Sequence, residues 1–278
     1  SGKCKERFER MRSLDSVKKA LEFIENDQAR TIEDQKELVL IEAPTGHEEN
    51  RAREFAERLK ALGLEQVHID QGGNVISVMK GAGTGPKVLL EGHLDTVFPF
   101  GTVKTVEERD GFLYAPGIGD DTRALAMLLG IVRALKHSGI RTMGDVIFVG
   151  TTREEGMGGL GGMKYFLEEN NDIDISLSID NNDMANIVYE ATGGETYEVN
   201  FYGIGGHAFG AFGEMAQPLH AAAGRLQKLR ILLCRKNRKP VSAFLISMAA
   251  MTRESMPLPR KRLLSLISVL IRRRNWIS

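Results

Sequence analysis

Short apolar runs alternate with longer amphipathic segments over the first two-thirds of this 278-residue chain. The apolar runs have the length and composition of buried strands. They are residues 66–69, 74–79, 87–90, 145–151 and 175–180. The amphipathic segments have apolar residues at helical spacing, and they are residues 16–30, 33–42, 47–62, 121–137 and 158–169. A hairpin is expected over 102–114. This alternation predicts an α/β fold, in which a mostly parallel sheet is flanked by helices.

The pattern changes after Gly193-Gly194, where we place a domain boundary. A strand is expected at 197–202 and a helix at about 218–229. We therefore divide the chain into a first domain (1–192), the beginning of a second domain (193–224) and a C-terminal tail (225–278).

The tail differs from the rest of the chain in charge. The whole chain carries 37 Lys and Arg against 37 Asp and Glu, a net charge of zero. Residues 225–278 nevertheless hold 14 of the basic residues and a single acidic residue, Glu254, with no glycine and no aspartate. A shift this abrupt is typical of a separate domain, or of an arm that binds nucleic acid or a membrane.

Cysteine content and hydropathy narrow the class of protein. The sequence has two cysteines, Cys4 and Cys234, which are too few for a disulfide scaffold or a thiolate metal site. No apolar run reaches 18 residues, and no secretory signal pattern is present. We therefore expect a cytoplasmic protein without a membrane partner.

A histidine and several acidic residues follow the predicted strands or open a predicted helix. They are His93, Asp95, Asp120, Asp121, Glu154, Glu155 and Asp180. Open α/β sheets build their sites at the carboxyl ends of the strands. One imidazole with several carboxylates suits a divalent metal that activates water. The sequence therefore predicts a metal-dependent hydrolase.

Each motif has a plainer interpretation when it stands alone. His93 could be a strand-end histidine beside a solvated Asp95, and one of Asp120 and Asp121 is expected to cap the next helix. The glutamate pair after residues 145–151 could be an exposed surface pair. On an extended segment its two side chains face opposite ways, so that one could bind metal while the other takes a proton from water. The ordered combination of motifs favours the metal site.

Four motifs resemble those of a family of co-catalytic di-zinc peptidases and deacylases. This family includes tripeptidase T, carboxypeptidase G2, acetylornithine deacetylase and succinyl-diaminopimelate desuccinylase. The motifs are LLEGHLDTVFP (89–99), PGIGDD (116–121), TREEG (152–156) and GGHA (205–208). The resemblance runs from about residue 33 to residue 223. It implies a zinc-peptidase-like catalytic domain, interrupted by an inserted α+β lid or dimerisation domain that begins at residue 193.

The resemblance also implies the ligands of two zinc ions, for which cobalt or manganese are alternatives. His93 and Asp180 would bind one ion, Glu155 would bind the second, and Asp120 would bridge the two.

The resemblance assigns three further roles. Asp95 would support His93, and Glu154 would be the general base that takes a proton from water. His207 would reach the active site of the partner in a homodimer and stabilise the oxyanion there.

The sequence departs from the family pattern in two places near the site and in one further along. Thr122-Arg123 replaces a common Lys-Gly, and Asn181 replaces a common Gly; neither change removes a ligand. The last zinc ligand of the family is a histidine that follows the lid, whereas the last histidine here is His220, in the predicted lid helix. We therefore expect the second zinc site to be incomplete in this chain.

The missing last histidine coincides with the basic tail. In a shifted reading frame, the third base of each codon is read with the first two bases of the next codon. With codons that are permitted for the written residues, this frame can encode segments that resemble the family's lid at residues 223–230, 254–262 and 263–278. We therefore expect the tail to be out of frame. The alternative is a genuine tail that binds nucleic acid or a membrane, which predicts salt-sensitive binding.

Together these patterns predict a zinc-dependent exopeptidase of short peptides, a homodimer in its intact form, with no nucleic-acid or membrane partner. The first alternative is an N-acyl-amino-acid deacylase of the same family. The second is an inactive, truncated remnant.

Overall fold

The computed structural model describes residues 2–181, 183, 186–189, 192–204, 220–225, 227, 248–251 and 264–276. The chain divides into two compact units, Ser1–Asn186 and Ile187–Ser278, and each is described by itself. The domain assignment made from the sequence, with boundaries after residues 192 and 224, stays a prediction.

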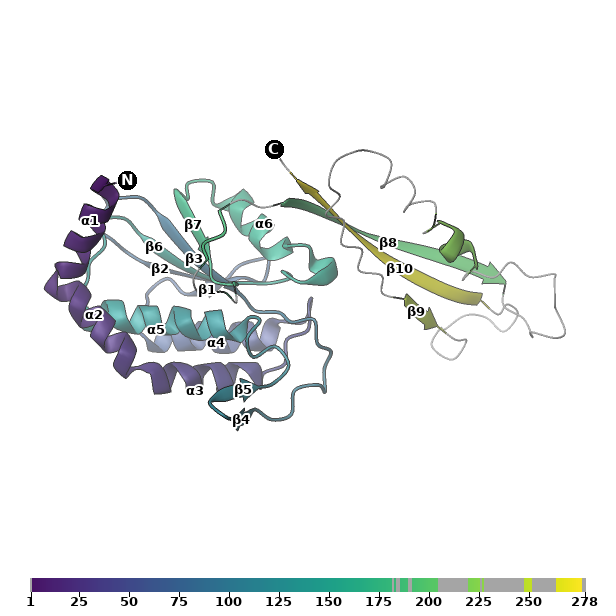
Figure 1. Cartoon of the computed structure of the whole chain (residues 1–278), viewed down its shortest axis with the longest axis horizontal. Coiled ribbons are helices and arrows are strands. Elements are labelled where there is room, and N and C mark those ends of the chain that lie inside the picture. The colour runs from purple at the N-terminus through teal and green to yellow at the C-terminus, as the bar shows by residue number, and fades with distance from the viewer. Residues whose placement is uncertain are drawn as a thin grey trace. The chain divides into compact units, whose positions relative to one another are not determined.

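The first unit is built on a five-stranded sheet with the order β1-β2-β6-β3-β7 (Figure 1). Its strands are β1 (His68–Ile69), β2 (Val75–Met79), β3 (Val88–His93), β6 (Val146–Thr151) and β7 (Ile175–Ser178). β3 is parallel to β6 and to β7, whereas β2 is antiparallel to both of its neighbours. Within this sheet, therefore, every strand except β2 runs in one direction, as a mostly parallel sheet requires.

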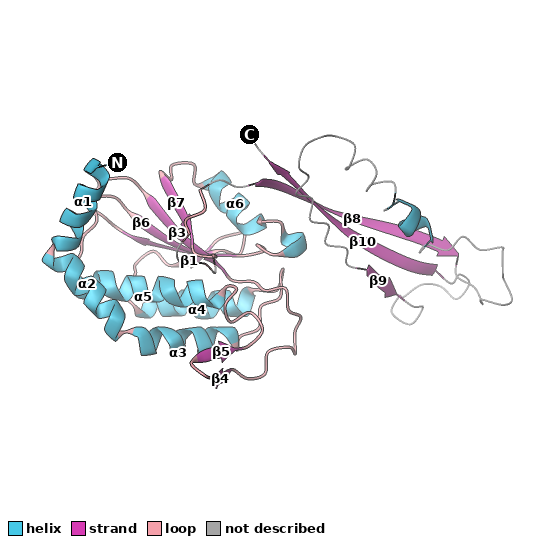
Figure 2. Cartoon of the chain, viewed as in Figure 1, coloured by secondary structure: helices cyan, strands magenta, loops and turns pink. Residues whose placement is uncertain are grey.

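Helices cover both faces of this sheet (Figures 1 and 2). α3, α4 and α5 pack on one face, where Phe55 of α4, Leu129 of α5 and Phe148 of β6 are fully buried in the larger core. α6 covers the other face, where Phe166 packs with Val149. The helix bounds are α1 (Gly2–Ser13), α2 (Asp15–Asn26), α3 (Gln28–Val39), α4 (Glu49–Ala61), α5 (Thr122–Ser138) and α6 (Gly161–Glu169). A hairpin, β4 (Glu107–Arg109) and β5 (Phe112–Tyr114), lies within the predicted range 102–114.

The strand register brings three carboxyl ends to one edge of the sheet. His93, the last residue of β3, lies opposite Thr151, the last residue of β6. Glu91 of β3 lies opposite Ser178, which ends β7. The segments that follow these strands therefore leave the sheet at the edge where the sequence predicts the site.

The second unit contains a three-stranded antiparallel sheet in which β10 lies between β8 and β9. Its strands are β8 (Thr192–Ile204), β9 (Met248–Met251) and β10 (Leu264–Trp276). Residues 220–225 and 227 are helical, within the helix expected at about 218–229. Two of the strands belong to the tail at 225–278, whose reading frame stays a prediction.

The structure differs from the sequence prediction at the N-terminus. α1 has no counterpart among the helices predicted from the sequence. Its sequence lacks the apolar stripe that indicates a packed helix, and in the structure it buries none of its residues. α2 and α3 meet at Asp27 rather than at residues 31–32. The Asp27 carboxylate accepts a hydrogen bond from Arg133 of α5 at 2.8 Å, a tertiary contact that local periodicity does not encode. None of the helices in the described ranges is long and apolar enough to cross a membrane.

Candidate active site

Six of the predicted site residues lie together at the carboxyl edge of the sheet in the first unit. Each comes from the end of a strand or the start of a helix: β3, β6, β7 and α5. We call this group the His93 site, and its members are His93, Asp95, Asp120, Glu154, Glu155 and Asp180.

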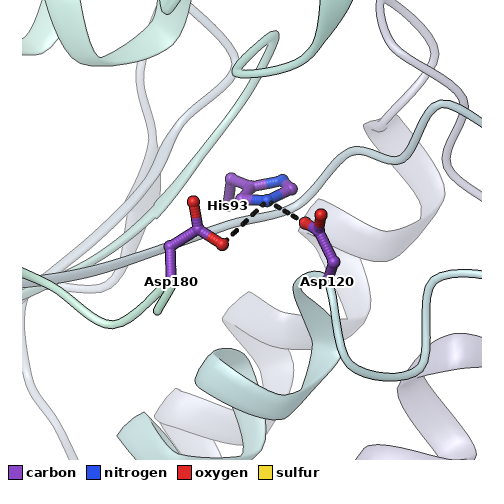
Figure 3. Close-up of side chains that lie close together, drawn as sticks. All are labelled: His93, Asp120 and Asp180. Atoms are coloured by element: carbon purple, nitrogen blue, oxygen red, sulfur yellow. Dashed lines mark hydrogen bonds and ion pairs between the residues drawn. The ribbon is translucent and has the colours of Figure 1, made fainter. Parts of the chain in front are cut away.

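The imidazole of His93 lies among three carboxylates, of which Figure 3 shows Asp120 and Asp180. Its Nε2 lies 2.7 Å from Oδ1 of Asp120 and 4.0 Å from Oδ1 of Asp180. Its Nδ1 lies 3.4 Å from Oδ1 of Asp95. His93 and Asp95 are buried, whereas the side chains of Asp120 and Asp180 are 65% and 42% exposed. The site therefore combines a buried floor with a rim that a ligand can reach.

Asp95 connects the end of β3 to the glutamate pair. The backbone N–H of Glu154 donates to its Oδ1 at 2.9 Å, and that of Glu155 donates to its Oδ2 at 3.0 Å. The hydroxyl of Thr45 also donates to Oδ2, at 2.8 Å. The sequence links Asp95 to His93 but gives no signal for Thr45, whose Pro-Thr-Gly context indicates only a break in the helical pattern.

Asp121 does not make the helix cap that we expected from the Asp-Asp pair. It occupies the N-cap position of α5, but its side chain makes no capping hydrogen bond. Its Oδ2 instead accepts the backbone N–H of His93 at 3.0 Å. Asp121 is fully buried, and burial raises its pKa to about 8. It supports the end of β3, while Asp120 contacts the imidazole.

The neighbouring carboxylates raise the pKa of His93. Burial would lower the pKa of the imidazole, but the hydrogen bond to Asp120 and the nearby carboxylate of Asp95 outweigh burial and raise it to about 11. The contact with His93 in turn lowers the pKa of Asp120. Burial opposes a low pKa at Asp95, yet His93 and the N–H groups of Glu154 and Glu155 lower it.

The other three carboxyl groups have raised pKa values. Burial, reinforced by the charges of Glu155 and Asp180, raises the pKa of Glu154 to about 7. Burial and then the charge of Asp120 raise the pKa values of Glu155 and Asp180. Because one imidazole faces five carboxyl groups, a bound cation would lower the electrostatic energy of the site.

The donor atoms have the chemistry and spacing of a metal centre. Two overlapping groups, His93–Asp120–Asp180 and His93–Glu154–Glu155, each have ligand atoms within 4.8 Å of one another. Imidazole nitrogen and carboxylate oxygen are ligands of zinc and related divalent ions. The residues therefore fit a divalent metal. The glutamate pair differs from our expectation of opposite-facing side chains, since both carboxylates belong to one group.

The two departures from the family pattern that lie near the site contact each other. Arg123, in the first turn of α5, donates from Nη2 to the backbone oxygen of Asn181 at 3.0 Å. It thereby ties the helix that follows Asp120 to the residue that follows Asp180. The partners are 58 residues apart, so no local pattern predicts the contact.

His207 lies outside the described residues, and its role stays a prediction. The structure brings together every other residue that the sequence assigned to the site.

A family model matches the part of the chain that carries the site. The model is described as Peptidase family M20/M25/M40 and matches residues 89–239, just over half of the chain. The matched segment includes all six residues of the His93 site.

Curated relatives match a shorter stretch. A protein of Pyrococcus abyssi named as a LysW-lysine/LysW-ornithine hydrolase is 39% identical over 121 residues, which are 44% of this chain and 32% of the relative. Carboxypeptidase G2 of Pseudomonas sp. (strain RS-16) is 32% identical over 165 residues, 56% of this chain and 39% of the relative. The chain thus spans about a third of the length of the curated relatives that it matches.

Solved structures confirm the predicted fold class. The dipeptidase Dug1p of Saccharomyces cerevisiae has a TM-score of 0.65 at 12% sequence identity, over 93% of this chain and 72% of that one.

Proposed function

The chain belongs to Peptidase family M20/M25/M40, and from this premise we propose that it is a zinc-dependent hydrolase that cleaves short peptides as an exopeptidase. The observation that carries the proposal is the His93 site, in which one buried imidazole meets five carboxyl groups at the carboxyl edge of the sheet. Structural ion pairs are normally balanced in charge, whereas this site has an excess of negative charge that suits a cation.

In this proposal four residues hold two zinc ions. His93 and Asp180 would hold one ion and Glu155 the other, and Asp120 would contribute its carboxylate to both. Zinc bound at these residues would polarise the scissile carbonyl and lower the pKa of water.

Glu154 is the general base. Its carboxylate takes a proton from the attacking water and returns it to the leaving amine. A base is most effective when its pKa lies near the working pH, and the pKa of Glu154 is about 7, raised chiefly by burial.

Asp95 orients the reacting groups on both sides of the site. Its Oδ1 lies 3.4 Å from Nδ1 of His93 and also accepts the backbone N–H of Glu154. His207 is assigned to the partner's active site in a homodimer of the intact protein, where it stabilises the oxyanion.

A peptide substrate is supported by the name of the Pseudomonas relative, a carboxypeptidase. The second candidate is hydrolysis of an N-acylated amino acid, since none of the contacts of the His93 site distinguishes a peptide bond from an N-acyl amide.

The test is a substrate panel run with the zinc-, cobalt- and manganese-loaded chain. Di- and tripeptides are compared with N-acetyl and N-succinyl amino acids, and Glu154→Gln is the matched control. We expect hydrolysis of peptides that Glu154→Gln abolishes. Hydrolysis of the acylated amino acids alone would overturn the choice of substrate.

An inactive remnant makes a different prediction about metal content. A remnant would bind at most one metal ion and hydrolyse neither class of substrate. Two tightly bound ions per chain would contradict it.

A further inference from the structure

The segment that carries the glutamate pair is held by side chains from three other parts of the first unit. Four consecutive backbone N–H groups, those of residues 152–155, each donate to a side-chain oxygen. The N–H of Thr152 donates to Oδ1 of Asn74 at 3.0 Å, and that of Arg153 donates to Oε1 of Glu48 at 3.0 Å. The next two donate to Asp95.

The carbonyl groups of the same segment are bonded by the turn that follows it. The oxygens of residues 152, 153, 154 and 155 accept the N–H groups of residues 162, 161, 160 and 158, at 2.9, 3.0, 3.3 and 2.8 Å. Gly158 permits this close return, because a Cβ there would lie 2.5 Å from the oxygen of Arg153. With both sides of its backbone bonded, the segment has one strongly preferred conformation.

Arg153 is the strained residue of this segment. Its φ is +53°, in the left-handed region that costs about 1 kcal/mol or more for a residue with a side chain. Such a conformation persists only where the surroundings enforce it. The bond from the Arg153 N–H to Glu48 acts directly on this residue.

The position of Glu48 allows it to accept this hydrogen bond. It is 5% exposed and stands immediately before α4, where the helix start favours a carboxylate. Its Oε1 also accepts the N–H of Gly46 at 2.7 Å. One buried oxygen therefore connects the loop before α4 to the residue before Glu154.

We propose that Glu48 is a positioning residue, which holds Arg153 in its left-handed conformation and so places Glu154 and Glu155 beside His93. The consequence for catalysis rests on the proposed function, in which Glu154 is the base and Glu155 a metal ligand. The consequence for the backbone conformation of residues 153–155 is independent of the proposed function.

The backbone is tested first, by amide hydrogen exchange of the metal-free chain. We compare wild type with Glu48→Ala, Glu48→Gln and, as a matched control, Glu49→Ala, which changes the exposed neighbour. Glu48→Ala should raise exchange at residues 153–155 about tenfold or more, because a bonded N–H is freed, with β6 unchanged. Glu48→Gln keeps an acceptor oxygen and should recover most of the protection. Unchanged exchange in Glu48→Ala would overturn the proposal.

Catalysis is tested on the metal-loaded chain with a peptide substrate. Because small displacements of reacting groups are costly, kcat of Glu48→Ala should fall about 10- to 100-fold with KM little changed. Glu48→Gln should recover most of kcat, and Glu49→Ala should match wild type. Adding Arg153→Gly to Glu48→Ala should raise kcat again, because glycine adopts a positive φ without strain.

The outcomes separate the two proposals. A wild-type chain that cleaves no peptide overturns the proposed function, while the exchange measurement still decides the role of Glu48. An equal loss of kcat in Glu48→Ala and Glu48→Gln would overturn positioning by an acceptor oxygen. If Glu48→Ala does not fold, Glu48→Asp replaces it, since its shorter side chain cannot reach both N–H groups.

Discussion

Two acidic regions of the first unit differ in how their charges are balanced. On the face of the sheet that α3, α4 and α5 cover, Asp34 is 1% exposed and lies within 2.9 Å of Arg30, Arg58 and Arg133. Those arginines also pair with neighbouring carboxylates. We call this group the arginine–carboxylate cluster, and its members are Arg30, Arg58, Arg133, Asp27, Asp34, Glu37 and Glu54.

The His93 site has a much larger excess of acidic groups. Three arginines face four carboxylates in the cluster, whereas one imidazole faces five carboxyl groups in the site. In the cluster, charges of opposite sign satisfy one another and tie α3 to α4 and α5. In the site, crowded carboxyl groups raise the pKa values of Glu154, Glu155 and Asp180. The cluster, whose positive and negative charges nearly balance, thus stabilises the fold. The His93 site, whose negative charges are in large excess, can bind a cation.

The largest expected effect separates catalysis from folding. Glu154→Gln should lower kcat by about 10²–10⁴-fold, the usual contribution of a general base, while metal content stays that of wild type. Steady-state kinetics and elemental analysis of the same sample measure both. Glu57→Gln, on the exposed face of α4, is the control. If Glu154→Gln retains turnover, Glu154 is not the general base.

The converse experiment breaks the arginine–carboxylate cluster. Asp34→Ala should lower the free energy of unfolding by about 3 kcal/mol, because it removes the shared partner of Arg58 and Arg133, whose side chains are only 15% and 14% exposed. Urea denaturation measures the change. Asp15→Ala, which removes an exposed ion pair with Lys18, should leave the urea midpoint almost unchanged. Similar small effects of both substitutions would show that the cluster does not stabilise the fold.

Added zinc should distinguish the two regions by its effect on stability. A ligand that binds only the folded chain stabilises it by about 2.7 kcal/mol at a concentration one hundred times its Kd. Thermal unfolding of wild type and of Asp34→Ala should therefore shift upward with zinc, whereas the shift in His93→Ala should be much smaller. Equal shifts in wild type and His93→Ala would place the zinc elsewhere.

The smallest effect concerns a carboxylate outside both regions. A hydrogen bond from Lys80, and another from the N–H of Gly81, lower the pKa of Asp145 below its ordinary value of 3.8. Its contribution to stability is therefore present above pH 3.8 and is lost as the pH falls through the lower, folded-state pKa. The urea midpoints of wild type and Asp145→Asn should differ near pH 6 and converge in acid. A difference that grows on acidification would reverse the sign of this contribution.

The sequence predicts the His93 site better than the arginine–carboxylate cluster, for a physical reason. Each site residue follows a strand or opens a helix, so local patterns identify it, and the carboxyl edge of a parallel sheet brings such segments together. Asp34 and Arg133 lie 99 residues apart on two amphipathic helices, where charged residues are expected in any case. Nothing local shows that these particular residues are buried and paired.

The same distinction holds for the fold. The buried strands β3 and β6 and the helix α5 were predicted from periodicity, since one core fixes their apolar positions. The reversed direction of β2, the break at Asp27 and the backbone contacts of Asp121 and Glu48 depend on contacts between distant segments. Those features require the structure.

The most direct test of the central claim is the amount of zinc retained by the purified chain after dialysis. Zinc per chain is measured for wild type, His93→Ala and Asp34→Ala. The account predicts at least one zinc ion in wild type and in folded Asp34→Ala, and less zinc per chain in His93→Ala than in either. The same zinc content in wild type and His93→Ala, or no zinc in wild type, would contradict the assignment of the His93 site as a metal centre.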